Sequence, residues 1–452
     1  MKLKWLLSIL SITATVTIDA FPATSPSSIN TFQSKLYDHH SISFHQPKLC
    51  DDTVVQYSGY LNVGKDDHYF FWFFESRVNP ETAPFTVWLN GGPGCSSMIG
   101  LWQELGPCRV NKDGTKAIYN KGSWNQVSNI LFFDQPDGVG FSYGVNNVFS
   151  TDDAAPLAYK LIQVFFESFP KYKNLDFHFY GESYGGHYIP AFANYILEQN
   201  LKAKHTKNHV INLKSIGIGN GWTDPLIQSQ YYEKMACDSS YGPVLNKTDC
   251  QLMKKRTPKC VELTKKCYAT GTNEDCIFAD NYCNELSSIY DNSQRSYYDI
   301  RTTEEIPGTY ITFLNSTSTR KAIGAKKYYE ECPSPPYYQF AKTGDDARNF
   351  SPRVVKLLNH GVRVLIYAGD SDYVCNWYGN YAWTSQLKFK NSDEYSKLKL
   401  QPWKIGKKEV GQFQSAGGLT FVRVYEAGHE VPYYQPEVAL QMFTNAVKNL
   451  EY

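Results

Sequence analysis

The sequence predicts an α/β protein with a mixed, mostly parallel β-sheet, helices on both faces of the sheet, and a disulfide-stapled insertion. Three observations support this fold class. Short apolar runs each end in Gly, Asn or Asp; helix-like segments separate several of these runs; and seven of the eleven cysteines fall within residues 235–333. Alternating strands and helices are typical of an α/β sandwich.

The expected strands are rich in apolar and aromatic residues. Such runs are expected of strands that helices cover on both faces of a parallel sheet. The first two are β-rich runs around a turn at residues 64–67. The full set of expected strands is residues 56–63, 68–74, 84–89, 130–133, 177–180, 216–219, 362–367 and 420–424, with helices over residues 154–168 and 188–199.

Residues 235–333 interrupt this alternation. They are rich in Lys, Thr and Asn and contain no long apolar strand. We interpret them as an insertion, or cap, that disulfides staple because it cannot form a large core of its own. The core then has two parts, residues 46–234 and 334–452. A zinc site is the competing interpretation, but the chain has no C-x-x-C pair and no H-E-x-x-H motif.

The N-terminus resembles a secretory signal peptide, which we place at residues 1–20. Two lysines precede a mostly apolar stretch, and Ala20 offers a small residue for cleavage. A membrane anchor is the alternative, but the stretch is short for a bilayer span. Residues 21–45 are rich in Ser, Thr, Pro and His, and they are expected to form a mobile leader or a pro-segment.

Composition and cysteine count narrow the possible functions. Lys and Arg (45) nearly balance Asp and Glu (44), so no basic excess supports nucleic-acid binding. An odd number of cysteines in an oxidising compartment leaves at least one thiol unpaired. Asn246, Asn315 and Asn349 begin glycosylation triplets. We expect a secreted, vacuolar or lysosomal protein without a membrane anchor, either monomeric or homodimeric.

The pentapeptide at residues 181–185 matches G-x-S-x-G and makes Ser183 a candidate nucleophile. An expected strand precedes it and an expected helix follows it. Such a strand-turn-helix corner needs small flanking residues, because its backbone is strained and tightly packed. The alternative is an ordinary loop rich in Ser and Gly. The motif in this context predicts the α/β-hydrolase fold.

A serine nucleophile requires a base, and a carboxylate must orient that base. In this fold the acid and the histidine follow the serine and lie beyond the carboxyl ends of strands. Of the ten histidines, His429 alone directly follows a suitable strand. Asp370 and Asp372 both follow the strand at residues 362–367. Position alone does not choose between them, and the unused one would form the turn.

Several motifs together resemble the serine carboxypeptidases of the fungal, carboxypeptidase Y-like type. They run in the family's order from about residue 57 to the C-terminus, which makes the resemblance highly specific. The matching segments are W-L-N-G-G-P-G-C-S-S at 88–97, D-Q-P-D-G-V-G-F-S at 134–142, G-E-S-Y-G-G-H-Y at 181–188, G-N-G at 219–221, A-G-D-S-D at 368–372 and G-H-E-V-P at 428–432.

The resemblance implies a serine-type carboxypeptidase that releases C-terminal amino acids from peptides and proteins at acidic pH through an acyl-enzyme on Ser183. It resolves the acid as Asp372 and implies an oxyanion hole from the amides of Gly92 and Tyr184. It also implies a site for the substrate's terminal carboxylate. That site comprises Asn90, Gly91, Glu104 and Glu182.

Two carboxyl groups beside a substrate carboxylate repel one another unless they share protons. A protonated Glu can donate a hydrogen bond to the substrate, whereas an ionised one cannot. Binding is therefore expected to be best in acid and to weaken as pH rises through the pair's raised apparent pKa values. The alternative places Glu182 at an exposed corner and Glu104 on a helix surface.

The resemblance implies four of the disulfides. Cys375 matches the free thiol that lines the site in carboxypeptidase Y, which leaves Cys50 and Cys108, and pairing these two is the economical inference. One further family disulfide has no counterpart near residues 299–310, so the insertion is expected to be looser there. The implied pairs are Cys95–Cys332, Cys237–Cys250, Cys260–Cys283 and Cys267–Cys276.

Three aromatic residues and one acid suggest substrate specificity. Glu430 follows the catalytic histidine where carboxypeptidase Y has an apolar residue, and it is expected to favour a C-terminal Lys or Arg by charge complementarity. Trp222, Tyr231 and Tyr232 suggest an aromatic wall for the penultimate side chain, although they could equally be core.

Other functions remain as alternatives. A lipase or esterase shares the fold and triad, but a site for apolar acyl chains has no use for buried acids. A carboxypeptidase-like acyltransferase uses the same serine with another acceptor. A non-enzymatic binding protein has no need of an intact triad. We expect no cofactor and no metal, and the expected partners are peptide and protein substrates with a free C-terminus.

Overall fold

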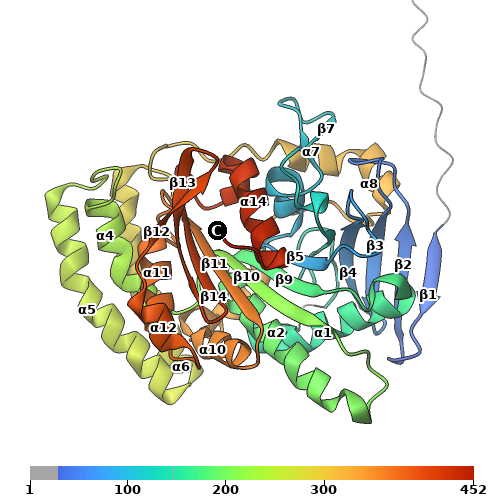
Figure 1. Cartoon of the computed structure of the whole chain (residues 1–452), viewed down its shortest axis with the longest axis horizontal. Coiled ribbons are helices and arrows are strands. Elements are labelled where there is room, and N and C mark those ends of the chain that lie inside the picture. Colours follow the sequence, from blue (N-terminus) through green and yellow to red (C-terminus); the bar gives the residue numbers. More distant parts are fainter. Residues whose placement is uncertain (1–28, 146) are drawn as a thin grey trace, which may run out of the picture.

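The computed structural model describes residues 29–145 and 147–452, and the expected signal peptide lies outside this range. Its centre is a twelve-stranded sheet of order β1-β2-β3-β4-β8-β5-β9-β10-β11-β14-β13-β12 (Figure 1). The strands are β1 (Asn30–Gln33), β2 (His40–His45), β3 (Gln56–Val63), β4 (Asp67–Phe74), β5 (Phe85–Leu89), β8 (Asn129–Phe133), β9 (Phe177–Ser183), β10 (Leu213–Gly221), β11 (Arg363–Gly369), β12 (Gln401–Ile405), β13 (Lys408–Ala416) and β14 (Leu419–Val424), and a separate ribbon pairs β6 (Cys108–Val110) with β7 (Ala117–Tyr119).

Every expected strand is present, and the sheet is mixed as expected. Parallel pairing is confined to the central strands from β8 to β14 in the sheet order, whereas both flanks are antiparallel. The parallel part is thus a smaller share of the sheet than the sequence analysis anticipates. The missed edge strands β12 and β13 are mostly polar, and on β12 only Trp403 is buried.

Residues 21–45 were expected to be a mobile leader or a pro-segment; the part that the structure describes is not mobile but forms strands, and the pro-segment alternative stays a prediction. β1 and β2 extend the sheet, and β2 pairs with β3 through residues such as Ile42 opposite Leu61. Ile42 is fully buried, and the ring of Phe44 packs on Tyr57. The sequence H-S-I-S-F-H does alternate polar and apolar residues, which is the signature of a half-buried strand, but its two apolar residues were too few to recognise.

Helices cover both faces of the sheet (Figure 1). α1, α2 and α10 pack on one face, and α14 with the π-helical turn η1 (Gly100–Glu104) packs on the other. The helices are α1 (Thr151–Ser168), α2 (Gly185–Lys202), α3 (Pro225–Gln228), α4 (Tyr232–Cys237), α5 (Lys247–Thr270), α6 (Asn273–Ser287), α7 (Thr309–Asn315), α8 (Thr317–Ile323), α9 (Ser334–Ala341), α10 (Ser351–Asn359), α11 (Trp377–Gln386), α12 (Ser392–Lys397), α13 (Val431–Tyr434) and α14 (Pro436–Lys448).

The aromatic strand β4 explains why two cores form. Successive side chains of a strand point to opposite faces of the sheet. Phe71 and Phe73 accordingly join the core under α1 and α2, whereas Phe70, Trp72 and Phe74 join the core under α14. All five are fully buried. Large apolar side chains on both faces therefore fix the sheet between its two helix layers.

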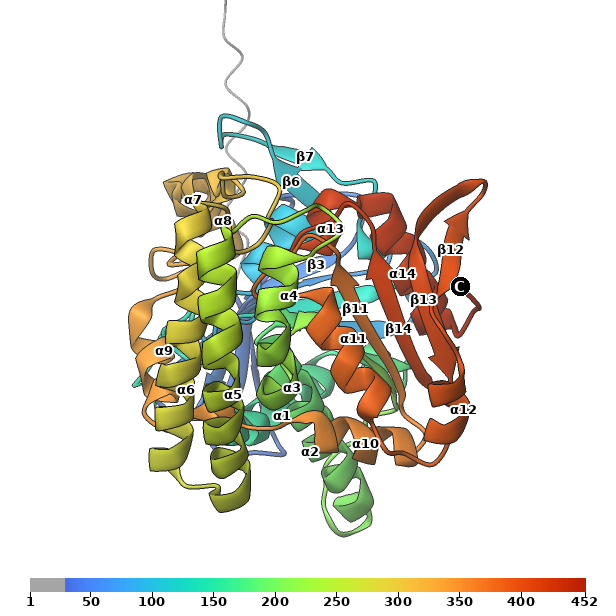
Figure 2. The ribbon, with the colours of Figure 1, turned by 90° about the vertical axis from the view of Figure 1, so that its left-hand side faces the viewer.

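The insertion is helical, and α5 and α6 form a long hairpin on the outside of the molecule (Figure 2). Disulfides Cys260–Cys283 and Cys267–Cys276 join α5 to α6, and Cys237–Cys250 joins α4 to α5. The buried apolar residues of the insertion's first part, up to Ile300, form two small clusters, whereas those of α7 and α8 join the core under α14. None of the helices in the described range is both long and apolar enough to cross a membrane.

The central parallel strands bring distant parts of the chain to one edge of the sheet. β5 leads into Asn90–Gly92, β9 ends at Ser183, and β10 carries Asn220 near its end. β11 leads into Asp370–Asp372, and β14 leads into the loop with His429. Parallel strands in register place these carboxyl ends together, which is where α/β sheets bind ligands.

Candidate active site

Ser183 lies at a sharp corner between β9 and α2. Its φ of +59° is in the left-handed region, which non-glycine residues adopt at a cost. A Cβ on Gly181 would lie 2.5 Å from the Leu89 carbonyl oxygen, whereas one on Gly185 would lie 3.6 Å from the same oxygen, an ordinary contact distance. The tight packing that the G-x-S-x-G motif predicts is therefore present at Gly181, on the strand side of the serine. At Gly185, on the helix side, there is room for a methyl group.

The loop after β5 packs directly against this corner. A Cβ on Gly91 would lie 2.3 Å from the Tyr184 amide nitrogen and 2.7 Å from the Ser183 Cβ. Gly92, at φ +111°, needs a conformation that favours glycine. These contacts bring the backbone of residues 91–92 beside the amide of Tyr184, the two places from which the sequence analysis expects oxyanion donors.

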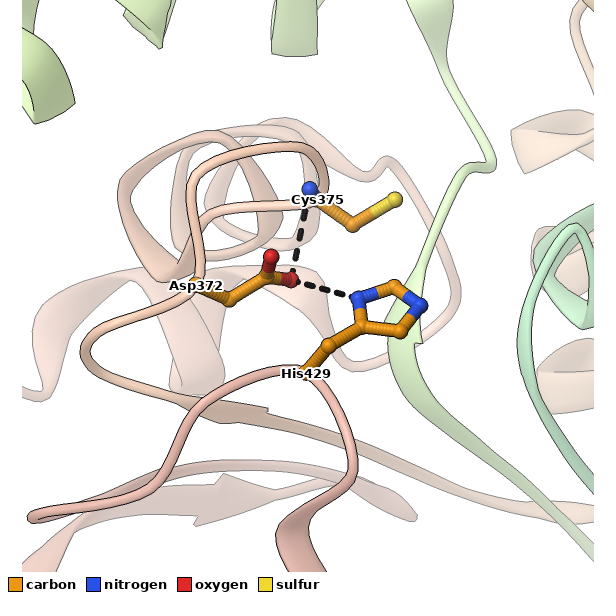
Figure 3. A group of neighbouring side chains, drawn as sticks. All are labelled: Asp372, Cys375 and His429. Atoms are coloured by element: carbon orange, nitrogen blue, oxygen red, sulfur yellow. Dashed lines mark hydrogen bonds and ion pairs between the residues drawn. The ribbon is translucent and has the colours of Figure 1, made fainter. Parts of the chain in front are cut away.

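His429 and Asp372 form a buried hydrogen-bonded pair. His429 Nδ1 lies 2.8 Å from Asp372 Oδ2, and the two side chains are 5% and 0% exposed (Figure 3). Among the described residues, His429 Nε2 has no hydrogen-bond partner. His429 and Ser183 line the same cavity. The carboxylate thus orients one ring nitrogen and leaves the other for a proton transfer.

Asn220 is a site residue to which the sequence analysis gave no role. Its Nδ2 donates to Asp372 Oδ2 at 2.8 Å, and its Oδ1 accepts from the Gly369 amide at 2.9 Å. It lies on β10, between the strands that carry Ser183 and Asp372. The signal was present in the G-N-G motif, but a sequence does not say which neighbour an amide side chain contacts.

The other candidate acid and base residues have structural partners. Asp370 accepts hydrogen bonds from the Tyr241 hydroxyl at 2.6 Å and from Arg423 Nη2 at 3.0 Å. His187, on α2, faces the carbonyl oxygens of Trp222 and Asp345. Asp370 therefore braces the strand edge rather than the imidazole, and His187 is directed into the core.

Asn90, Glu104 and Glu182 form a buried polar cluster. Asn90 Nδ2 donates to Glu104 Oε1 at 3.1 Å and to Glu182 Oε1 at 3.0 Å. Glu104 is 1% exposed and Glu182 3% exposed, so the alternative of two surface acids is wrong. The π-helical turn η1 carries Glu104 inward, and β9 carries Glu182.

Burial raises the pKa of both carboxyl groups. The pKa of Glu182 lies well above its usual value, first because of burial and then because of the charges of Glu104 and Glu430. Burial also raises the pKa of Glu104, and hydrogen bonds with Glu182 and Asn90 partly oppose it. A shared proton between the two carboxyls satisfies oxygens that would otherwise repel. The pair therefore holds a proton in acid.

One cavity of about 350 Å³ is lined by Asn90 and Glu182 of this cluster, together with Ser183 and His429. These four residues lie at its base, and its mouth includes Tyr298, Tyr337 and Tyr338. Glu430 also lines it. Like the three tyrosines, two polar residues beside Glu430 were not identified from the sequence. These two are Gln103 and Glu331.

Gln103 holds Glu430 in place. Its Nε2 lies 2.8 Å from both carboxylate oxygens of Glu430. Burial and the charge of Glu104 raise the pKa of Glu430 well above its usual value. Burial also raises the pKa of Glu331, which accepts a hydrogen bond from the Tyr310 hydroxyl. The cavity therefore gains negative charge as pH rises.

Cys375 is a buried free cysteine beside the acid–base pair (Figure 3). Its amide donates to Asp372 Oδ2, and its sulfur, an Asp372 oxygen and a His429 nitrogen lie within 4.8 Å of one another. Burial raises the pKa of the thiol, so it stays protonated. Asp372 already accepts hydrogen bonds from Asn220 and His429, and this favours an acid–base relay over a metal ligand set.

Trp222 and Tyr232 do not line the Ser183 cavity. Their rings stack at 6.2 Å and line a neighbouring small cavity between the core and α4–α6. Tyr232 is 7% exposed and packs on Tyr373, so the core alternative describes it better. Tyr231 ends a short 3₁₀ turn before α4 and is absent from the cavity lining as well.

The cysteine pairs of the described chain are those that the sequence analysis expects, including Cys50–Cys108 and Cys95–Cys332. The second of these ties the end of the insertion to the loop after β5. Asn246 is exposed, and its side chain caps α5. Asn315 and Asn349 are partly buried, and both Asn315 side-chain atoms bond to the backbone of Tyr329.

Comparison with known proteins identifies relatives over nearly the whole chain. Residues 47–449 match the family model of serine carboxypeptidases. Carboxypeptidase S1 of Penicillium janthinellum is 43% identical over 411 residues, which cover 88% of this chain and 97% of the relative. A vacuolar serine-type carboxypeptidase of Saccharomyces cerevisiae is 44% identical over 410 residues, covering 87% and 79%.

A solved structure gives the same result. The prohormone-processing carboxypeptidase Kex1 of Saccharomyces cerevisiae, in a truncated form, superposes with a TM-score of 0.75 at 25% identity. The match covers 89% of this chain and 94% of that one. The resemblance in sequence motifs thus extends to the arrangement of the whole fold.

Gly91→Ala is expected to lower kcat/KM by at least about 100-fold, the effect of losing an oxyanion donor. The added methyl would collide with the Tyr184 amide and the Ser183 side chain. Gly185→Ala, in the same corner but without a close contact, is the matched control and should keep most activity. Both variants are assayed on a blocked dipeptide, and melting temperatures show whether each folds. Equal losses in the two variants would contradict the steric explanation.

Proposed function

The chain belongs to the serine carboxypeptidase family and is a serine-type carboxypeptidase; we propose that Ser183, His429 and Asp372 carry out its reaction. The Ser183 hydroxyl attacks the carbonyl carbon of the last peptide bond, and His429 Nε2 accepts the proton. Asp372 holds the imidazole in the orientation and tautomer that this step needs. The 2.8 Å hydrogen bond between Asp372 and His429, and the free Nε2, support these roles.

The remaining steps use the same groups. Amides of Gly92 and Tyr184 stabilise the oxyanion of the tetrahedral intermediate. His429 then gives its proton to the leaving amino group, which departs as the released amino acid and leaves an acyl-enzyme on Ser183. Water attacks the ester with His429 as base, and the serine hydroxyl is restored.

The main support for an exopeptidase is the pair of carboxyl groups of Glu104 and Glu182. Glu182 lines the Ser183 cavity, and Glu104 lies beside it under Asn90. With raised pKa values, the pair retains a proton that can be donated to a substrate's terminal carboxylate. Asn90 and the backbone at Gly91 complete this carboxylate site. An esterase for apolar acyl chains gains nothing from such a cluster, and we therefore place the esterase and acyltransferase alternatives second.

Glu430 is proposed to recognise a basic C-terminal side chain. Glu331 and Gln103 line the same part of the cavity, so a Lys or Arg there would face two acids and an amide oxygen. Because the pKa of Glu430 is raised, its negative charge develops only as pH increases. Selection of Lys and Arg should accordingly strengthen at higher pH. Cys375 is proposed to border the neighbouring side-chain site through its buried thiol.

The location and organisation of the protein are further proposals. The vacuolar relative, the disulfides and the acid-adapted carboxyl pair support the secretory pathway, with the enzyme secreted or delivered to a vacuole. Residues 235–333 would act as a cap over a core made of residues 46–234 and 334–452. Among the glycosylation triplets, the exposed Asn246 is the best placed acceptor.

The direct test is release of C-terminal amino acids from blocked dipeptides between pH 4 and pH 7. Wild-type protein should release a free amino acid from the peptide and fail on the matching C-terminal amide, because the amide lacks the carboxylate. Ser183→Ala should lower kcat by about 10⁴-fold or more. Hydrolysis of a simple ester without peptide release would instead support the esterase alternative.

Glu182→Gln tests the shared proton. The pair is protonated below its raised pKa, so wild-type binding is strongest in acid and weakens as pH rises. The neutral amide cannot ionise, so the variant should raise KM for a peptide several-fold at pH 5 but less at pH 7, or lower KM there. KM measured for one peptide at both pH values decides this, with Glu437→Gln, an exposed acid on α14, as the control. An equal penalty at both pH values would refute the shared proton.

Glu430→Met tests the specificity proposal. In the wild type, the ratio of kcat/KM for C-terminal Lys to that for C-terminal Leu should rise between pH 4.5 and pH 7 as Glu430 ionises. The substitution should lower this ratio at pH 7 by about 10-fold, equivalent to about 1.4 kcal/mol, and flatten its pH dependence. Glu437→Met should leave the ratio unchanged. A ratio that Glu430→Met does not alter would remove Glu430 from substrate recognition.

A further inference from the structure

The insertion contacts the two loops that carry the acid and the base. The Tyr297 carbonyl accepts hydrogen bonds from the amides of Tyr373 (3.2 Å) and Val374 (3.1 Å). The Ile300 amide donates to the Ser371 carbonyl at 2.9 Å. Residues on both sides of Asp372 are therefore bonded to one short stretch of the insertion, residues 297–300.

The same stretch holds His429. The amide of His429 donates to the Tyr298 carbonyl at 2.8 Å. A Cβ on Gly428 would lie 2.4 Å from that carbonyl oxygen, so the approach requires glycine there. The Tyr298 ring packs on the imidazole with centroids 5.0 Å apart. Tyr298 is 46% exposed on the cavity side, whereas His429 is 4% exposed, so the tyrosine lies between the imidazole and solvent.

The segment itself is firmly anchored. Ser296 Oγ accepts from the Tyr298 amide at 3.0 Å, and the Tyr290 hydroxyl donates to the Ser296 carbonyl at 3.0 Å. The Tyr290 ring stacks on Tyr373, next to Asp372, at 3.7 Å. Tyr290 thus connects the disulfide-linked part of the insertion to the loop that carries Asp372.

An ion pair lies in the region where one family disulfide has no counterpart. Asp299 binds Arg301 through two hydrogen bonds of 2.8 and 2.7 Å, and the Arg301 guanidinium lies 5.5 Å from the ring centroid of Tyr434 on α13. The expectation that residues 299–310 are looser stays a prediction. The ion pair and the aromatic contact place Arg301 beside α13.

We propose that residues 296–300 are a positioning element of the active site, which fixes the Asp372 loop and the His429 loop relative to each other. The proposal rests on the proposed catalytic roles of Asp372 and His429. The backbone bonds set the separation of the two loops, and Tyr298 shields the imidazole. The insertion then does more than cover the cavity, because it also holds in place the two loops that carry the acid and the base.

The expected consequence is kinetic. Small displacements of catalytic groups cost about 100-fold in rate when they spoil alignment. A loosened 296–300 segment should therefore lower kcat, whereas the carboxylate site of Asn90, Glu104 and Glu182 lies on other elements and should keep KM nearly constant. A segment that only forms the cavity wall would instead change KM.

Ser296→Ala and Tyr298→Ala test the proposal, with Tyr298→Phe as the conservative variant. Each is assayed for kcat and KM on a blocked dipeptide and for the rate of inactivation by diisopropyl fluorophosphate, which needs the triad but no terminal carboxylate. Both alanine variants should lose about 10-fold or more in kcat and in inactivation rate, with KM within about twofold. Tyr298→Phe should restore both rates.

Two controls separate positioning from general damage. Phe278→Ala removes an exposed aromatic of α6 and should leave all three parameters unchanged. Tyr337→Ala removes a cavity tyrosine that is also 46% exposed but makes no backbone bond to either loop in the described chain, so it should act on KM. Hydrogen exchange should become faster at the amides of Tyr373 and His429 in Ser296→Ala, while the melting temperature confirms folding.

The outcomes are distinct for the two proposals. Unchanged kcat and inactivation rates in folded Ser296→Ala and Tyr298→Ala overturn the positioning role alone. Peptide release that survives Ser183→Ala overturns the proposed catalytic roles, whatever the insertion variants do. A change confined to KM in Tyr298→Ala would make this residue a cavity wall only.

Discussion

The hydrogen bond between Asp372 and His429 is the contact on which the rest of the site depends. The two residues are 57 positions apart and follow different strands, β11 and β14. Parallel pairing of these strands brings the two loops together, and Asn220 on β10 binds the same carboxylate oxygen. Because the carboxylate is buried, its orientation is set by these donors and not by solvent. Ser183, at the end of the next strand, β9, lies on the same edge.

The second main feature of the site is a set of buried carboxyl groups with raised pKa values. Asn90 donates a hydrogen bond to both Glu104 and Glu182 inside the protein, and the proposed shared proton would remove the repulsion between the two carboxyl groups. Burial is thus the cause of the raised pKa values, and the raised pKa values are what make an acid into a hydrogen-bond donor for another carboxylate. Burial also raises the pKa of Glu430, farther along the cavity, so the charge of this residue depends on pH.

The insertion is stable for a different reason from that of the core. The apolar clusters of α4–α6 are small, so disulfides between these helices supply what packing does not. The insertion's contact with the active-site loops is made mainly by backbone atoms at residues 297–300, and the side chains of Ser296, Tyr290 and Tyr298 hold that backbone in place.

The sequence by itself determined the central strands, the two main helices, Ser183 and His429, because each depends on a local pattern: an apolar run, its end, and the residue just beyond. Position alone did not choose between Asp370 and Asp372, and the family resemblance implied Asp372. Residues 21–45 were expected to be a leader or a pro-segment, because one short strand with two apolar residues gives too weak a local signal. Only the tertiary structure decided that Asn220, Gln103 and Glu331 belong to the site, that Trp222 and Tyr232 lie outside its cavity, and that Tyr298 covers the imidazole. These facts depend on contacts between residues far apart in the chain, and such contacts exist only once the sheet has brought its strand ends together.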